Sequence, residues 1–411
     1  MKLHLAISLL ILPAALFAQS DVPMAKPEDV GMSSKRLERI HAFIQDYIDT
    51  NQIAGAVTLV ARKGKVVHFE AQGWRYKEEN LPMPKDAIFS LASMTKPIVS
   101  SALMMLWEDG KFMLDDPISK WLPSYAKKDV LDPQTSQRTP ARAITVRHVL
   151  THTSGLSLET GGQRPKTLLE EIERSANRPL AFQPGDRWQY GASTDFVAAL
   201  VEKISGMTVD EFLKQRIFEP LGIRDTHYNV PKEKVDRVAA IYRPDKDGKI
   251  TLMRKPEYHE PTAYFPGVAG LNGTAADYFR FSQMLLNGGE YAGHRLLGRM
   301  TVDMMISNQI GTGKPVYIRG NGYGFGLGFG ILTDPSKSPD ALSIGTFTWG
   351  GANGTLFWID PLEDLIGIMM IQINPYSHFN IRPLYSVVVS QAITDSLAGQ
   401  KPRIMGYDTP R

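Results

Sequence analysis

The stretch Phe89-Ser90-Leu91-Ala92-Ser93-Met94-Thr95-Lys96-Pro97-Ile98 places a serine and a lysine three positions apart at the start of a predicted helix. Residues with this spacing share one helix face, so we expect the Lys96 ammonium beside the Ser93 hydroxyl. A serine is a poor nucleophile until a neighbour takes its proton, and a desolvated lysine can do this or tune another base. The alternative is a capping serine followed by a solvated lysine, so the pattern predicts a nucleophile only in context.

Two further stretches supply that context. In Phe182-Gln183-Pro184-Gly185-Asp186-Arg187-Trp188-Gln189-Tyr190, a Pro-Gly turn precedes a tyrosine whose ionised phenol an ammonium could stabilise. Thr348-Trp349-Gly350-Gly351-Ala352 is predicted to be the end of a strand where glycines let a substrate approach the backbone. The alternatives are an ordinary core tyrosine and a strand end with a bulge.

The sequence resembles the serine β-lactamase and penicillin-binding-protein superfamily, specifically its class C β-lactamase-like esterase branch, the family VIII carboxylesterases. Beyond the stretches above, matching segments occur in order at 114–117 (LDDP), 144–156 (ITVRHVLTHTSGL) and 219–222 (EPLG). The resemblance implies an α/β (α+β) fold, an antiparallel sheet flanked by helices with an inserted all-α domain. It divides residues 21–411 into an α/β part, about 21–90 and 265–411, and a helical insertion, about 91–264.

The resemblance also assigns roles. Ser93 is implied to be the acylated nucleophile and Lys96 and Tyr190 the proton-transfer pair, without deciding which of the two is the immediate base. The backbone N–H groups of Ser93 and Ala352 are implied to form the oxyanion hole. Trp349, Gly350 and Gly351 are implied to line the substrate.

Two departures from the lactamase pattern bear on the substrate. Trp349 stands where lactamases of this class have a lysine that helps bind the β-lactam carboxylate, and Ala192 stands where an asparagine usually contacts the substrate amide. We therefore expect a serine hydrolase that cleaves carboxylic esters. The alternatives are a β-lactamase or D-alanyl-D-alanine carboxypeptidase, and a catalytically silent module that binds cell-wall peptide or another ligand.

Composition excludes several classes of ligand and catalytic group. The 411 residues carry 46 Lys+Arg and 43 Asp+Glu, so the net charge of +3 gives no basic footprint for nucleic acid. The chain has no cysteine, which excludes disulfides, thiolate metal sites and cysteine nucleophiles.

His148 and His152 are four residues apart, a spacing that suits zinc on a helix. Val149 stands where a metalloprotease has its glutamate, so a structural role is favoured for the two histidines. We expect no metal and no cofactor, and a small-molecule ester or amide as the substrate.

Residues 1–20 have the pattern of a secretory signal peptide: Lys2, an apolar run over 5–17, and small residues at Ala18 and Ser20, either of which could precede cleavage. No later stretch is long enough to cross a bilayer. The sequence thus predicts an exported protein, periplasmic or secreted, without stable membrane insertion.

Periodicity predicts the main elements. We expect an amphipathic helix over 37–48, hairpins over 56–69 and 354–373, and helices starting near Ser93, Thr208 and Thr274. Alternating glycines and apolar residues over 322–330 predict one strand, and a last helix is expected over 381–397.

Overall fold

The computed structural model describes residues 22–158, 165–317, 320–377 and 379–396, and its centre is one eight-stranded sheet. Its order is β12-β13-β14-β15-β16-β1-β2-β3, and every neighbouring pair is antiparallel. The strands are β1 (Gly55–Arg62), β2 (Lys65–Tyr76), β3 (Leu81–Pro82), β12 (Tyr323–Phe325), β13 (Gly330–Leu332), β14 (Phe347–Gly350), β15 (Leu356–Asp360) and β16 (Leu365–Met370). The sheet is thus assembled from both ends of the chain.

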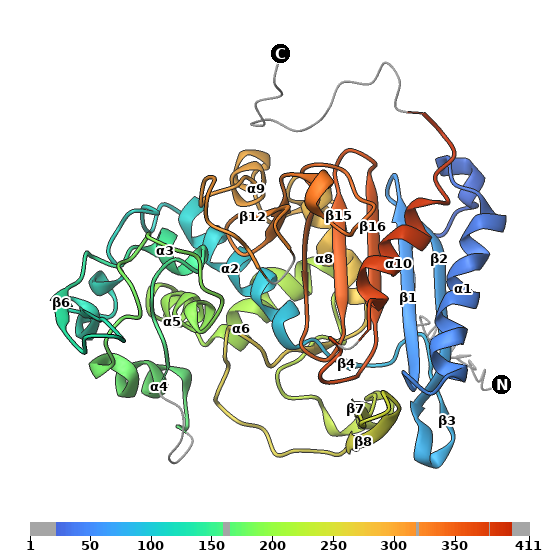
Figure 1. Cartoon of the computed structure of the whole chain (residues 1–411), viewed down its shortest axis with the longest axis horizontal. Coiled ribbons are helices and arrows are strands. Elements are labelled where there is room, and N and C mark those ends of the chain that lie inside the picture. The colour runs from blue at the N-terminus through green and yellow to red at the C-terminus, as the bar shows by residue number, and fades with distance from the viewer. Residues whose placement is uncertain (1–21, 159–164, 318–319, 378, 397–411) are drawn as a thin grey trace, which may run out of the picture.

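Helices cover both faces of this sheet. Phe357 and Trp358 are consecutive on β15, so their side chains point to opposite faces. The Phe357 ring meets Tyr278 of α8 at 4.8 Å between centroids, whereas the Trp358 ring meets Tyr385 of α10 at 5.3 Å. Helix α1 packs beside α10 and against β2 (Figure 1). The predicted fold class, an antiparallel sheet flanked by helices, is confirmed.

Helices α2 to α6 lie together beside the sheet, where α2 packs against α5 and α6, and α5 against α3 and α4 (Figure 1). The helices are α1 (Ser34–Asp49), α2 (Thr95–Glu108), α3 (Val146–Leu150), α4 (Leu168–Arg174), α5 (Ser193–Ser205), α6 (Val209–Leu213), α7 (Glu219–Leu221), α8 (Ala275–Leu286), α9 (Arg299–Met305) and α10 (Ile381–Ser390). Short two-stranded sheets are β4 (Phe89–Ser90) with β9 (Asn272–Gly273), β5 (Asp129–Leu131) with β6 (Arg138–Pro140), β7 (Ile241–Pro244) with β8 (Ile250–Arg254), and β10 (Glu290–Tyr291) with β11 (His294–Arg295).

Local capping explains where the predicted helices begin. The Ser33 side chain accepts the Arg36 N–H ahead of α1, and Thr274 accepts the Asp277 N–H ahead of α8. Thr208 and Glu211 form a reciprocal capping box at α6. Such caps pair N–H groups that have no partner within the helix.

Two expected elements are corrected. The strand expected over 322–330 is a hairpin, because the chain reverses at Gly326–Phe329, where the Gly326 N–H donates to the Phe329 carbonyl at 2.8 Å. Alternation alone does not reveal such a reversal. The helix expected over 381–397 ends at Ser390. Beyond it the chain pairs instead with the N-terminal segment, since the Ser33 N–H donates to Ala392 O at 2.8 Å.

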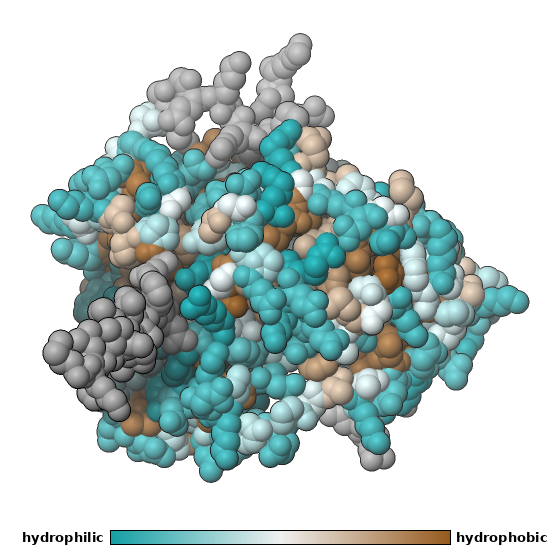
Figure 2. Space-filling view, turned by 180° about the vertical axis from the view of Figure 1, so that it is seen from behind, coloured by the Kyte–Doolittle hydropathy of each residue, from teal (hydrophilic) through white to brown (hydrophobic). Residues whose placement is uncertain are grey.

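No helix within the described ranges is long and apolar enough to cross a membrane. On the face opposite that of Figure 1, most exposed residues are hydrophilic, and apolar residues are exposed in small separate patches (Figure 2). The leader expected at residues 1–20 lies outside the described residues and stays a prediction.

Candidate active site

Ser93 and Lys96 meet at the start of α2, as their spacing predicts. Ser93 lies in the 3-10 turn Ala92–Met94 that leads into the helix, and it is partly exposed. The Lys96 side chain is buried, and its Nζ donates to Ser93 Oγ at 3.1 Å and to the Val268 carbonyl at 2.7 Å. The hydroxyl is therefore accessible while the ammonium beside it is shielded from water.

The backbone around Ser93 is held from two sides. β4 pairs with β9, and the Leu91 N–H donates to the Leu271 carbonyl at 2.9 Å. Ala92 has a φ of +47°, which is uncommon for a residue with a Cβ and marks strain directly before Ser93. Ser93 is the second residue of its turn, so its N–H is among those without a partner inside the helix.

Tyr190 joins this pair. The Lys96 ammonium lies 4.6 Å from the centroid of the Tyr190 ring. The phenol is surrounded by aromatic rings: His152 at 5.0 Å, Trp349 at 5.3 Å and Trp188 at 6.2 Å between centroids. The structure therefore brings the three predicted catalytic side chains together from two distant parts of the sequence.

The third predicted stretch ends β14 next to the Ser93 turn. A Cβ on Gly351 would lie 2.4 Å from the Leu91 carbonyl and 3.3 Å from Ala92 Cβ, so the strand end touches the residues before Ser93. Ala352 is exposed, and its N–H donates no hydrogen bond to another described residue. The oxyanion hole that the N–H groups of Ser93 and Ala352 are implied to form stays a prediction.

Trp349 is almost fully buried, with 2% of its surface exposed. Its Nε1–H donates to the Tyr190 hydroxyl at 3.4 Å, and its ring meets Phe325 edge-on. The indole thus contacts the predicted catalytic tyrosine directly. The neighbouring Trp188 also stacks on Tyr190, but its Nε1 has no partner among the described residues.

Sequence reasoning missed Arg382 of α10. This buried guanidinium donates to the Gly351 carbonyl and, at 2.7 Å, to the Thr355 carbonyl, and it stacks on the Tyr376 ring. Arg382 thereby stabilises the turn that connects β14 to β15. A single arginine in an otherwise apolar helical stretch was the available signal.

Asp195 of α5 was also missed. The side chain is 2% exposed, and Oδ1 accepts the Val268 N–H at 3.0 Å. Burial raises its pKa to about 6, against the opposing effects of the Val268 N–H, the Lys96 charge and the Gly267 N–H. The residue is therefore an anion near neutral pH, close enough to Lys96 for the two charges to interact.

The histidine pair is not brought together as metal ligands. His148 Nδ1 accepts the Thr145 N–H at 3.1 Å and completes the cap of α3. His152 is buried among the rings around Tyr190, and burial, followed by the Lys96 charge, lowers its pKa to about 3. Across the described part of the chain, no group of three or more His, Cys, Asp or Glu is placed to hold a metal ion.

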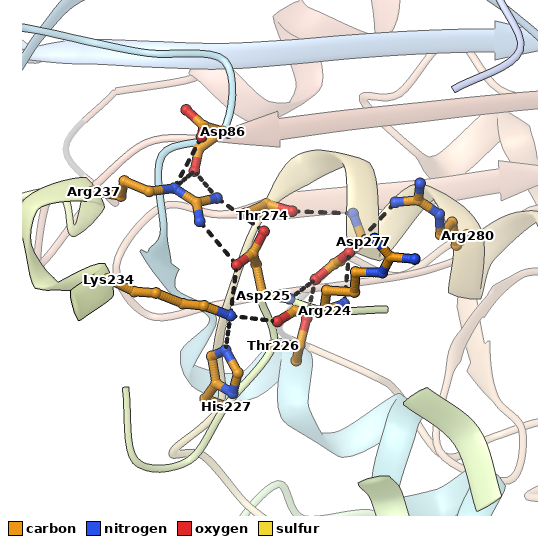
Figure 3. Close-up of polar contacts among 10 residues, drawn as sticks. All are labelled: Asp86, Arg224, Asp225, Thr226, His227, Lys234, Arg237, Thr274, Asp277 and Arg280. Carbon is orange, nitrogen blue, oxygen red and sulfur yellow. Dashed lines mark hydrogen bonds and ion pairs between the residues drawn. The ribbon is translucent and has the colours of Figure 1, made fainter. Parts of the chain in front are cut away.

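An ion network surrounds the segment at Asp225–His227, which pairs with β9 (Figure 3). Arg237 binds Asp225 at 2.9 Å and Asp86 at 2.9 Å, and Lys234 binds Asp225 at 3.0 Å. His227 exchanges backbone hydrogen bonds with Asn272, each 2.8 Å long. The network thereby fixes the strand that follows the Val268 loop.

Comparisons with known proteins show which proteins this chain is similar to. A sequence model of the family described as Beta-lactamase matches residues 40–388. Protein Rv1367c of Mycobacterium tuberculosis (strain ATCC 25618 / H37Rv) is 33% identical over 366 residues, which cover 82% of this chain and 90% of that protein. Esterase EstB of Burkholderia gladioli is 30% identical over 357 residues, covering 78% and 86% respectively. The solved structure of EstCE1, described as a hydrolase with promiscuous acyltransferase activity, superposes with a TM-score of 0.72 at 25% identity, covering 88% of this chain and 99% of that one.

Proposed function

The chain belongs to the Beta-lactamase family and is a serine hydrolase, and we propose that it cleaves carboxylic esters through an acyl-enzyme formed on Ser93. The observation that carries this proposal is the convergence of three groups. Lys96 Nζ lies 3.1 Å from Ser93 Oγ and 4.6 Å from the centre of the Tyr190 ring. Such a cluster can accept the serine proton and return it to a leaving group.

The proposed reaction has two halves. In the first, Ser93 Oγ attacks the ester carbonyl while its proton passes to the Lys96–Tyr190 pair, and the C–O bond to the alcohol breaks as that proton is returned. In the second, water attacks the acyl group, transfers its proton to the same pair, and releases the acid and the free serine. The N–H groups of Ser93 and Ala352 would stabilise the oxyanion in both halves.

The surroundings of β14 favour an ester over a β-lactam. Trp349 is an uncharged ring where a lactamase of this class has a lysine, and Arg382 is buried behind the strand with its donors on backbone carbonyls. Neither supplies an accessible cation for the β-lactam carboxylate. Two relatives, EstB and the lovastatin esterase of Penicillium rubens, also carry the name of esterase.

The test compares nitrophenyl-ester and nitrocefin turnover by the purified protein. We expect ester hydrolysis, no substantial nitrocefin hydrolysis, and a drop of about 10³-fold or more in kcat for Ser93→Ala. Ser101→Ala is the matched control, because Ser101 is a buried serine of the same helix that only donates to the Pro97 carbonyl. A fluorophosphonate should add to Ser93 by mass spectrometry. Nitrocefin turnover without esterase activity would overturn the ester assignment, and absence of both activities and of labelling would favour a silent module.

A further inference from the structure

The Lys96 ammonium is held mainly by a loop, Phe265–Leu271, that comes from outside its own helix. Its contact with the Val268 carbonyl, 2.7 Å, is shorter than its contact with Ser93 Oγ, 3.1 Å. A charged donor on a carbonyl makes one of the stronger hydrogen bonds in a protein. The position of the Val268 carbonyl therefore determines where Lys96 Nζ lies relative to Ser93 Oγ.

Asp195 holds the Val268 residue in place. The carboxylate accepts the Val268 N–H at 3.0 Å and also the Gly267 N–H. The loop sits directly on α5, because a Cβ on Gly267 would lie only 2.1 Å from the Thr194 carbonyl. Val268 thus binds Asp195 through its N–H and Lys96 through its carbonyl, which belong to successive peptide units of the same residue.

A buried anion in this place is expensive to maintain. Three titratable side chains interact with the Asp195 carboxylate, and all three are buried. They are Lys96 on α2, Glu171 on α4 and Tyr228 in the segment after α7. Of these, Lys96 is the cation, and its charge favours the ionised form of Asp195. An asparagine could accept these N–H groups without placing a charge in the interior, so structural support alone does not explain a carboxylate here.

We propose that Asp195 is a positioning residue for catalysis, which fixes the Val268 carbonyl that holds Lys96 and supplies a negative charge beside the ammonium. The inference rests on the proposed function, since it concerns the same proton-transfer pair. Asp195 does not touch Ser93 and is assigned no contact with substrate.

Asp195→Asn tests the proposal, because the amide keeps the size and an acceptor oxygen but loses the charge. We expect kcat to fall about 10- to 100-fold with KM changed less than about twofold, as a loss of proton-transfer efficiency predicts. We also expect the wild-type rate to fall as the pH drops through about 6, where Asp195 takes up a proton, and this limb to be absent in the variant. Asp195→Glu, which restores a carboxylate, should recover part of the rate.

Asp277→Asn is the matched control. Asp277 is also buried, burial raises its pKa, and it accepts the Asp225 N–H at 2.7 Å and the Thr226 hydroxyl at 3.1 Å (Figure 3). Its replacement should lower stability without removing the limb near pH 6. If Asp195→Asn keeps the wild-type kcat and pH profile, or if Asp277→Asn changes the profile equally, the proposal is wrong.

Labelling of Ser93 separates this inference from the proposed function. If wild-type Ser93 does not react with a fluorophosphonate, the proposed function has failed. If it reacts and Asp195→Asn reacts at the same rate, only the inference has failed. Should Asp195→Asn not fold by circular dichroism, Gly267→Ala pushes the same loop off α5 without replacing Asp195. That variant should lose kcat, and an unchanged kcat would overturn the proposal.

Discussion

Tyr190 is flanked by two tryptophans that differ in one hydrogen bond. Trp349 Nε1 donates to the Tyr190 hydroxyl, whereas Trp188 stacks on the same ring with no partner for its Nε1 among the described residues. The two indoles thus contact the same ring, but of the two it is Trp349 that directs its N–H at the phenol oxygen, which we propose takes part in moving the serine proton.

Replacing each indole by a phenyl ring separates packing from hydrogen bonding. Trp349→Phe should lower kcat by roughly 2- to 10-fold, the effect of one hydrogen bond. Trp188→Phe should leave kcat close to the wild-type value, although both variants lose similar ring area. Steady-state ester hydrolysis at fixed pH measures the difference. Equal effects of the two substitutions would mean that the indole N–H has no role.

Asp195 also predicts a pH dependence of stability. Its pKa is about 6 in the folded protein against an ordinary value of 3.8, so between these values the folded state binds more of this proton than the unfolded state. This carboxyl therefore makes wild-type stability fall as the pH rises through that window. The Tm of Asp195→Asn minus that of the wild type should rise from pH 4 to pH 7 in thermal scans. A constant or falling difference would contradict a buried, ionised Asp195.

At the scale of elements, the β12–β13 hairpin rests on the helix that carries Ser93. Gly328 in its turn has a φ of +99°, and a Cβ there would lie 2.5 Å from Ser100 Cβ and Oγ on α2. Phe325, on the first strand of the hairpin, touches both Trp349 and His152. The hairpin thus contacts α2 through its turn and the aromatic rings around Tyr190 through Phe325.

Gly328→Ala should disturb both stability and activity. A Cβ at positive φ costs about 1 kcal/mol, and overpacking against α2 adds roughly 1–3 kcal/mol. Gly311→Ala is the control, since Gly311 also has a positive φ, +70°, but has open space around its Cβ position. Urea denaturation and kcat should show a loss in both quantities for Gly328→Ala and only the smaller stability loss for Gly311→Ala.

The sequence predicts those elements and residues whose signal is local. Ser93 with Lys96 is recognisable from helical spacing, and helices α1 and α8 from periodicity and caps. Asp195 and Arg382 escape such reasoning because their partners, Val268 and Gly351, are distant in sequence and use backbone atoms, which carry no residue signature. The hairpin at 323–332 and the early end of α10 were mispredicted for a related reason, since tertiary contacts decide both.

At the scale of the whole molecule, Arg62 joins the two ends of the chain. It is fully buried on β1 and donates to the Val30 and Gly31 carbonyls at 3.0 and 2.9 Å. It also binds Glu363 in the β15–β16 turn and Asp395 after α10, each at 2.6 Å. One guanidinium therefore satisfies groups from both termini and from the centre of the sheet.

Arg62→Leu should destabilise the protein by about 3 kcal/mol or more, because it removes the guanidinium from the Val30 carbonyl and the Glu363 carboxylate and leaves Asp395 with Lys63. Arg142→Leu, which breaks an exposed ion pair with Asp186, should cost less than about 1 kcal/mol. Chemical denaturation provides both values, and folded Arg62→Leu should retain its kcat because the site is remote. A loss as small as that of Arg142→Leu would show that the network is dispensable.

The pairing of β1 with β16 has a consequence for biosynthesis. Residues 57–62 pair with β2 on one side, but their partners on the other side are residues 365–370. Closing so long a loop is entropically costly and slow, and it is impossible before the last strand has left the ribosome. Until then β1 is an apolar strand with one open edge, the kind of segment that chaperones shield from aggregation. The central sheet is therefore completed only after residues 365–370 have been synthesised.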